Sequence, residues 1–224
     1  MKFIGFDNRT TAGIALAKEL KAWNIADPII LALPRGGVPV ALEVTRAFKA
    51  PLDLVLVRKI GVPFQPELAG GAVVDGDNPE IIYNDDVIRL TGLHRADLQP
   101  VADRELKEIE RRRELYLKNR ARLSAKGRNV IVVDDGLATG ATMRVALHAL
   151  RRQSPNRLIA AVPVAPRDTI ESLRGEADEI VCLAQPEPFV AIGLYYANFE
   201  QLRDEDVVRL LAEADDITSD SSGD

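Results

Sequence analysis

The sequence predicts an α/β protein with a doubly wound, mainly parallel five-stranded sheet and flanking helices. Five short runs are apolar on both faces, as buried parallel strands are. Helical periodicity follows three of these runs, and such alternation favours an open parallel sheet. The 224 residues, 46% of them hydrophobic, suffice for one domain with some elaboration. The five expected strands are residues 28–33, 52–57, 130–133, 158–164 and 180–184.

Helices are expected after the first, third and fourth of these strands. Residues 38–48 and 143–150 place apolar side chains at helical spacing, and residues 168–174 continue the same order after the fourth strand. Each helix would return the chain to the start of the next parallel strand.

Residues 61–127 interrupt the alternation and are expected to form an insertion, or hood. Residues 61–86 are rich in Gly, Pro and Asp around the segments GGAVV and EIIY, which predicts a loop followed by a hairpin. The glycines and prolines of residues 61–77 further predict a mobile lid. Residues 94–126 mix both charges, which favours one long, exposed, salt-bridged helix over a nucleic-acid-binding patch.

We expect a single domain over residues 1–214 and an acidic, disordered tail over residues 215–224. Eight acidic residues and one Arg lie between positions 204 and 224, a net charge of −7, whereas the whole chain carries −5. The remaining body is therefore almost neutral, and its charge argues neither for nor against an anionic partner.

The composition excludes several classes of site. Cys182 is the single cysteine, which excludes an internal disulfide, and two histidines cannot complete a zinc or iron–sulfur site with it. No run approaches 18 apolar residues, and the chain turns polar within its first seven. We therefore expect a cytoplasmic protein with no membrane partner, no nucleic-acid partner and no transition metal.

Residues 130–142, VIVVDDGLATGAT, combine a buried strand, two acids, a glycine-containing turn and a helix. Ligands of open α/β sheets bind beyond the carboxyl ends of the strands. Gly136 and Gly140 let backbone N–H groups approach a phosphate, and Thr139 and Thr142 add hydroxyl donors at a helix N-terminus. The segment therefore predicts a phosphate site.

Asp134 and Asp135 cannot bind the phosphate itself because like charges repel. Their carboxylates can accept hydrogen bonds from sugar hydroxyls, or hold Mg²⁺ that the phosphates also bind. A P-loop is excluded because Ala141, not Lys, follows Gly140, and the chain contains no GxGxxG. A plain Asp-Gly turn before a helix would explain only part of the thirteen residues.

The segment resembles the signature of the type I phosphoribosyltransferases, which bind 5-phosphoribosyl 1-pyrophosphate (PRPP). The resemblance implies that Asp134 and Asp135 bind the ribose 2- and 3-hydroxyls and Mg²⁺, the metal directly or through PRPP or water. It also implies that the following loop binds the 5-phosphate. That loop is Gly136, Leu137, Ala138, Thr139, Gly140, Ala141 and Thr142.

The segment LPRGG follows the first strand and is similar in position to the family's pyrophosphate loop. Gly36 and Gly37 can open a backbone anion site, and Arg35 can reach a phosphate. A turn carrying a surface Arg is the alternative when this segment is taken alone.

The segment VRKIGVP, residues 57–63, resembles the Arg-Lys segment that leads into the mobile loop of adenine-type members. We expect Arg58 and Lys59 at the end of the second strand, where the resemblance makes them the catalytic cations that stabilise the departing pyrophosphate. A solvated Arg-Lys pair is the alternative.

Residues 188–199, PFVAIGLYYANF, loosely resemble the late segment with which purine-using members bind the base. By that resemblance Phe189 stacks on the base and Val190 reads its edge through the backbone, but the expected acid falls near Ala197. A buried strand with core aromatics explains the segment equally well. Members acting on hypoxanthine and guanine carry an acid where this chain has Ala138, which disfavours a 6-oxopurine.

The function implied is transfer of the 5-phosphoribosyl group from PRPP to a nitrogenous base or related acceptor, with Mg²⁺ as cofactor and pyrophosphate released. A non-catalytic PRPP-sensing module on the same fold is the alternative. Arg58 and Lys59 favour the enzyme, because a sensor needs no cations on a leaving group. The sequence leaves open the acceptor and whether the protein is a monomer or a homodimer.

Overall fold

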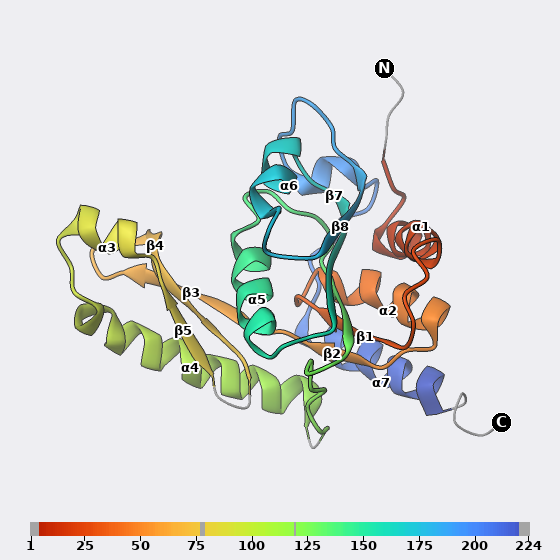
Figure 1. Cartoon of the computed structure of the whole chain (residues 1–224), viewed down its shortest axis with the longest axis horizontal. Coiled ribbons are helices and arrows are strands. Elements are labelled where there is room, and N and C mark those ends of the chain that lie inside the picture. The colour runs from red at the N-terminus through yellow and green to blue at the C-terminus, as the bar shows by residue number, and fades with distance from the viewer. Residues whose placement is uncertain (1–4, 77–78, 119, 220–224) are drawn as a thin grey trace. The chain divides into compact units, whose positions relative to one another are not determined.

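The computed structural model describes residues 5–76, 79–118 and 120–219, which fall into two compact units (Figure 1). The first unit is built from the chain up to residue 54 and from residue 121 onward, and the second from residues 55–120. The insertion expected at residues 61–127 is therefore a unit of its own. Its boundaries, residues 55 and 120, both lie nearer the N-terminus than expected.

The first unit contains a five-stranded parallel sheet in the order β2-β1-β6-β7-β8, which confirms the predicted fold class. The three central strands β1, β6 and β7 are buried almost throughout, as continuous apolar runs require. The strands are β1 (Pro28–Ala32), β2 (Leu52–Leu54), β6 (Asn129–Val133), β7 (Arg157–Val164) and β8 (Glu179–Ala184).

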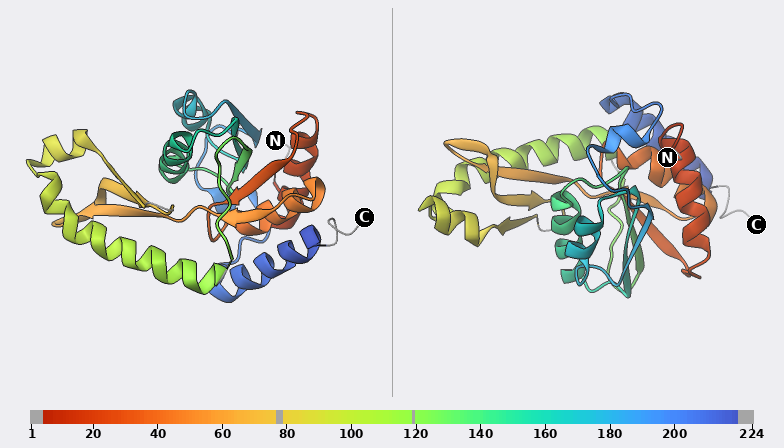
Figure 2. Two further views of the ribbon diagram at one scale, coloured as in Figure 1. Left: turned by 60° about the horizontal axis from the view of Figure 1, so that its bottom comes forward. Right: turned by 90° about the horizontal axis from the view of Figure 1, so that it is seen from above.

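Helices cover both faces of this sheet. Helices α1 and α2 pack against each other on one face and α5 lies on the opposite face (Figure 1). Helix α7 packs against α2 and β2 (Figure 2). The helices are α1 (Arg9–Lys21), α2 (Gly37–Phe48), α5 (Ala141–Arg152), α6 (Arg167–Leu173), the 3-10 helix η1 (Ile192–Tyr195) and α7 (Asp204–Ser219).

Helix α7 corrects the prediction of a disordered tail from residue 215. Residues 215–219 form its last turn, because the buried apolar stripe of Val207, Leu211 and Ala214 anchors the helix. Three acidic residues in its first turn suit the positive end of the helix dipole. Residues 220–224 lie outside the described part of the chain.

The second unit is a three-stranded antiparallel sheet in the order β3-β4-β5, with α4 packed on β3 and β4. The pairing of β4 with β5 confirms the expected hairpin between GGAVV and EIIY. The elements are β3 (Val57–Val62), β4 (Gln65–Val74), β5 (Glu80–Tyr83), α3 (Asp85–Thr91) and α4 (Arg95–Leu117).

Two expectations for this unit are wrong. The expected second core strand, residues 52–57, stops at Leu54, and Arg58 and Lys59 lie instead on β3. The loop expected at the start of this unit is mostly strand, because β3 turns back at Pro63 into β4 and buries Ile60 beneath the hairpin. The mobility of residues 61–76 stays a prediction, and residue 77 lies outside the described part of the chain. Antiparallel pairing thus holds a segment whose Gly and Pro content suggested a loop.

Helix α4 is shorter than the expected helix at residues 94–126 but has the salt-bridged face that the charge pattern predicts. Arg111 and Arg112 both donate to Glu108 at 2.7 to 3.0 Å, and these hydrogen bonds lower the pKa of Glu108 to about 2. The opposite side of the helix buries Leu98 and Ile109 against the sheet.

We expect the second unit to depend on the ion pair between Asp75 and Arg113, whose atoms Oδ2 and NH1 lie 2.5 Å apart with the Asp75 side chain only 3% exposed. Asp75→Ala removes a hydrogen bond between two charged and nearly buried groups, so the free energy of unfolding should fall by about 1.5 to 3 kcal/mol. The exposed pair of Asp85 and Arg95 is the control, and Asp85→Ala should cost clearly less because water screens this pair. Equal losses in denaturant titrations would contradict this.

Candidate functional site

The two acids of the VIVVDDGLATGAT segment lie where β6 ends at the carboxyl edge of the parallel sheet. Asp134 is half-buried and Asp135 is buried. The backbone N–H of Asp135 donates to Oδ1 of Asp134 at 2.8 Å, which fixes the first carboxylate against its own turn. The strand end therefore presents two adjacent carboxylates in a largely desolvated place.

Asp135 has a partner that the sequence did not predict. Nε of Arg9, the first residue of α1, donates to Oδ2 of Asp135 at 2.7 Å, and both side chains are nearly buried. The hydroxyl of Tyr196 donates to the carbonyl oxygen of Asp135 at 2.5 Å. Neither residue carries a local motif, and Arg9 is 126 positions away from Asp135.

The environment raises the pKa of both acids. Burial is the main cause for Asp134, and the neighbouring charge of Asp135 adds to it. Burial also raises the pKa of Asp135, but the hydrogen bond and charge of Arg9 oppose this shift. Burial raises the pKa of Tyr196 as well, so its hydroxyl remains a donor.

The LPRGG segment lies directly against these acids. A Cβ on Gly36 would overlap the carboxylate of Asp135, and one on Gly37 would lie 2.5 Å from the carbonyl oxygen of Val133. Only glycine fits such approaches. The backbone N–H of Leu33 also donates to the Val133 carbonyl at 2.9 Å, so the two loops lie side by side.

Arg35 lies between these glycines and the C-terminal helix. The peptide bond between Pro34 and Arg35 is cis. NH1 of Arg35 lies 3.4 Å from Oδ1 of Asp204, the first residue of α7, and both side chains are about one-third exposed. A long, half-exposed ion pair holds its partners weakly, so Arg35 remains available to an anionic ligand.

In the loop after the two acids, some residues contact the sheet and others face outward. Leu137 is buried and its N–H donates to the Val164 carbonyl at 2.9 Å, whereas Ala138 and Thr139 are exposed. Gly140 adopts a φ of +69° and caps α5. Because the first N–H groups of a helix lack partners within it, this loop can bind an anion.

A hydroxyl behind the loop fixes its position. Thr169, a buried residue of α6, donates through Oγ1 to the Ala138 carbonyl at 2.7 Å. Thr142, the predicted hydroxyl donor, lies exposed in the first turn of α5 next to Ala141. The structure thus brings residues 134–142, Gly36 and Gly37 together at one edge of the sheet.

Arg58 and Lys59 belong to the second unit and have acidic partners there. Arg58 donates through Nε and NH2 to Oε2 of Glu105 at 2.9 and 2.7 Å, and the Glu105 side chain is only 10% exposed. Lys59 pairs at 3.1 Å with Glu67, whose side chain is 95% exposed. Arg58 is therefore committed to Glu105, while the Lys59 pair can exchange with a ligand.

Phe189 borders a cavity of about 380 Å³ beyond the carboxyl ends of β7 and β8. One ring face stacks on Tyr195 with 5.3 Å between the centroids, so the ring is held in place. Four charged residues and two prolines line the rest of the cavity, whereas Val190 points to solvent with 72% of its surface exposed. The lining residues besides Phe189 are Pro166, Arg167, Asp168, Glu171, Pro186 and Glu187.

Asp134 and Asp135 fit a magnesium ion only if a bound substrate supplies most of the oxygen atoms that coordinate the metal. Nε of Arg9 already donates a hydrogen bond to Oδ2 of Asp135, and the Asp135 N–H already donates one to Oδ1 of Asp134. Within the described residues, no group of three or more His, Cys, Asp or Glu side chains could hold a metal ion. Hard carboxylate oxygens do suit Mg²⁺, which usually keeps waters and substrate phosphates as ligands.

Comparison with known proteins places the chain in a family. The family described as Phosphoribosyl transferase domain matches residues 8–197. The chain therefore belongs to the phosphoribosyl transferase family, as the resemblance of residues 130–142 predicts. The match includes Arg9 at its start and Tyr196 at its end.

Two kinds of relatives are similar over most of the chain. A Mycobacterium tuberculosis protein of strains CDC 1551 and H37Rv, provisionally named a phosphoribosyl transferase, is 45% identical over 209 residues. The match covers 93% of this chain and 47% of that protein, so the chain spans about half the length of the curated relatives it matches. The crystal structure of TT1426 from Thermus thermophilus is 41% identical, with a TM-score of 0.82 over 93% of this chain and 98% of that one.

Among the helices of the described residues, none has the length and apolarity needed to cross a membrane.

Cys182 is half-buried on β8, where burial raises the pKa of its thiol to about 11. The thiolate form is therefore rare at neutral pH, so Cys182 is a poor nucleophile.

We expect Gly36→Ala to abolish anion binding at this edge of the sheet without unfolding the protein. The added methyl group would displace the Asp135 carboxylate and separate it from Arg9. Gly92→Ala is the control, because a Cβ there meets nothing within 4 Å and only the φ of +69° opposes it, at about 1 kcal/mol. Calorimetric titration with PRPP and thermal melting measure the two effects. Unchanged binding by Gly36→Ala would show that the LPRGG segment lies outside the site.

Proposed function

We propose that the protein transfers the 5-phosphoribosyl group of PRPP to a nitrogenous base or related acceptor and releases pyrophosphate. The observation that carries this proposal is the contact of Gly36 and Gly37 with the strand end that bears Asp134 and Asp135. A sugar bound at the acids would then have one anion loop on each side, which matches a ribose phosphorylated at both ends.

The two acids are proposed to bind the ribose. Asp134 and Asp135 accept hydrogen bonds from its 2- and 3-hydroxyls through the carboxylate oxygens that Arg9 and the turn leave available. The loop of residues 136–142 binds the 5-phosphate with backbone N–H groups and the first turn of α5. These contacts fix the sugar so that its anomeric carbon faces the acceptor.

The pyrophosphate is proposed to lie on the LPRGG loop. Arg35 would give up its ion pair with Asp204 and bind a phosphate oxygen instead. By the resemblance of the VRKIGVP segment, Lys59 is proposed to stabilise the departing pyrophosphate, while Arg58 is paired with Glu105. Mg²⁺, when bound through PRPP, supplies positive charge that stabilises the leaving pyrophosphate. The chain's own cations add to this stabilisation as negative charge develops.

The reaction forms a bond between the anomeric carbon and an acceptor nitrogen while the bond to the pyrophosphate oxygen breaks. No covalent enzyme intermediate is needed, which suits a chain whose sequence shows no nucleophilic triad. The protein's contribution is to orient the ribose, neutralise the leaving group and exclude water.

The acceptor is proposed to stack on Phe189, whose ring is held by Tyr195 beside the cavity of about 380 Å³. Ala138 stands where members acting on 6-oxopurines carry an acid, so hypoxanthine and guanine are disfavoured as acceptors. The acids that line the cavity favour an acceptor with several hydrogen-bond donors.

Stabilisation by PRPP should require magnesium, because the pyrophosphate offers oxygen ligands and the described residues form no group of three or more that could hold the metal. Melting temperatures should rise with PRPP and Mg²⁺ together and stay near the ligand-free value with PRPP and EDTA. Mg²⁺ alone is the control. Equal shifts with and without the metal would show that PRPP binds without it.

Substitutions should separate the ribose end from the pyrophosphate end. Asp134→Asn and Asp135→Asn remove charges that accept hydrogen bonds, worth ~1.5 to 3 kcal/mol each, so PRPP binding should weaken roughly ten- to a hundredfold. Lys59→Ala should slow turnover more than it weakens binding, since its charge matters most as pyrophosphate leaves.

Calorimetric titration and single-turnover rates measure these two effects. Asp178, which pairs with Arg151 on the surface, supplies the control Asp178→Asn, which should leave both quantities unchanged. Loss of binding in Lys59→Ala together with normal binding in both Asn variants would reverse the assignment of the two ends.

A further inference from the structure

Arg9 contacts a carboxylate of the proposed ribose site without belonging to any of its loops. Its Nε lies 2.7 Å from Oδ2 of Asp135, and the two side chains are only 12% and 10% exposed. Removing one partner of an ion pair so shielded from water costs far more than at an exposed pair, because the other charge stays buried and uncompensated. Arg9 therefore controls where the Asp135 carboxylate lies.

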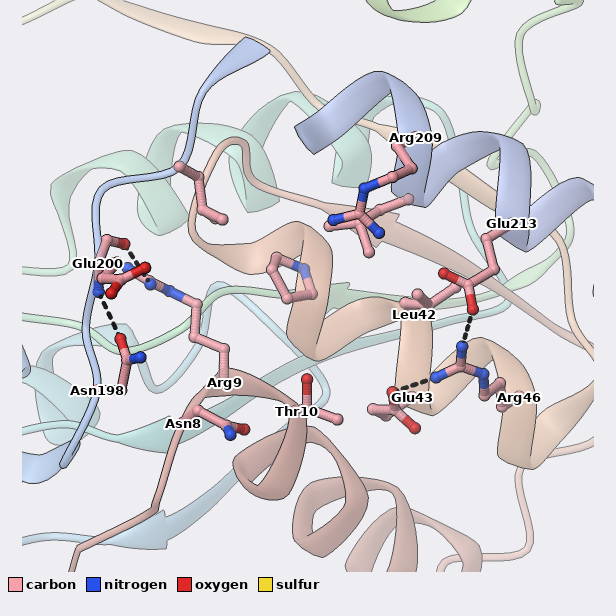
Figure 3. Close-up of a pocket in the computed structure, with 13 residues that line it drawn as sticks. Asn8, Arg9, Thr10, Leu42, Glu43, Arg46, Asn198, Glu200, Arg209 and Glu213 are labelled. Carbon is pink, nitrogen blue, oxygen red and sulfur yellow. Dashed lines mark hydrogen bonds and ion pairs between the residues drawn. The ribbon is translucent and has the colours of Figure 1, made fainter. Parts of the chain in front are cut away.

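The geometry of Arg9 is fixed by the residues after η1. Its guanidinium lies over the ring of Phe199, 3.8 Å from the centroid, and its NH1 donates to the Glu200 carbonyl at 2.9 Å. Figure 3 shows the side chain extending from the start of α1 towards Glu200. Asn8 caps the helix immediately before it. The guanidinium is thus held on two sides before it meets Asp135.

Charge gives this contact a use beyond stability. PRPP carries several negative charges, and two adjacent carboxylates in a desolvated strand end would repel both each other and the ligand. The charge of Arg9 offsets one carboxylate. Arg9 donates to Oδ2 of Asp135 and not to Oδ1, so Oδ1 is the oxygen that the inference assigns to a sugar hydroxyl.

We propose that Arg9 is a positioning residue for the ribose end of PRPP, which orients and neutralises Asp135 and does not itself contact the ligand. This inference rests on the proposed function, because it takes Asp135 as a ribose-binding acid. It assigns a role to the N-terminal segment, to which the signature motif gives none. Tyr196, which donates to the Asp135 carbonyl, supports the same residue through its backbone.

Two probes that each carry half of PRPP test the role. In the presence of Mg²⁺, Arg9→Gln should weaken binding of ribose 5-phosphate roughly ten- to a hundredfold and change that of inorganic pyrophosphate by less than about threefold. Arg9→Lys keeps the charge without the planar fork and should show an intermediate loss. Equal losses for both probes would mean that Arg9 is only structural and would overturn the inference.

A double-mutant cycle tests whether Arg9 acts through Asp135. In the Asp135→Asn background, Arg9→Gln should cause less than about a threefold further loss of ribose 5-phosphate affinity. Independent, additive losses would contradict a role through Asp135. If Arg9→Gln does not fold, Phe199→Leu is the second variant, because it removes the ring that supports the guanidinium. It should weaken the binding of ribose 5-phosphate several-fold and leave pyrophosphate binding unchanged. Equal effects on both probes, or no effect on either, would count against the proposal.

Controls separate this inference from the proposed function. Arg151→Gln removes a guanidinium that pairs with Asp178 at 3.0 Å and should bind both probes as the unsubstituted protein does. If the unsubstituted protein binds neither ribose 5-phosphate nor PRPP, the proposed function fails and the inference with it. If it binds both and Arg9→Gln binds ribose 5-phosphate equally well, only the role of Arg9 fails.

Discussion

The buried carboxylate of Asp135 is the point on which the site depends. It holds Arg9 through one oxygen, and it leaves room for Gly36 only because that residue has no Cβ. Through this one group the start of α1, the turn before α2 and the end of β6 are held together. Burial disfavours the ionised form of Asp135, and the hydrogen bond and charge of Arg9 oppose this effect, so the contact with Arg9 favours the charged carboxylate.

The parallel sheet supplies the second constraint, since it brings the ends of β1 and β6 to one edge. At that edge the loop after β6 returns Leu137 to the sheet and leaves the next residues facing outward at the start of α5. The acids proposed to bind sugar hydroxyls and the N–H groups proposed to bind phosphate thus follow each other within one short segment, residues 134–142. A phosphorylated sugar matches this order of charges, and the family match agrees with it.

Much of this could be predicted from the sequence. The five core strands are readable because each is apolar on both faces, and residues 130–142 carry their chemistry in a continuous segment. Arg9 could not be predicted, because its partner lies 126 positions away and no local pattern marks it. The hairpin of β3 and β4 was hidden by its Gly and Pro residues, whose pairing depends on a neighbouring strand rather than on local preference. The last turn of α7 could not be predicted, because its acidic residues indicate disorder while the apolar stripe that anchors the helix lies before them.

The central claim is that this arrangement releases pyrophosphate from PRPP rather than only binding it. The most direct measurement is pyrophosphate release from PRPP and Mg²⁺ against a panel of nitrogenous bases, beside the Lys59→Ala variant and a reaction without acceptor. We expect pyrophosphate release that depends on one class of acceptor and that falls in the Lys59→Ala variant. Tight binding of PRPP with no release above the acceptor-free rate, for any base in the panel, would contradict it and indicate a PRPP-sensing module.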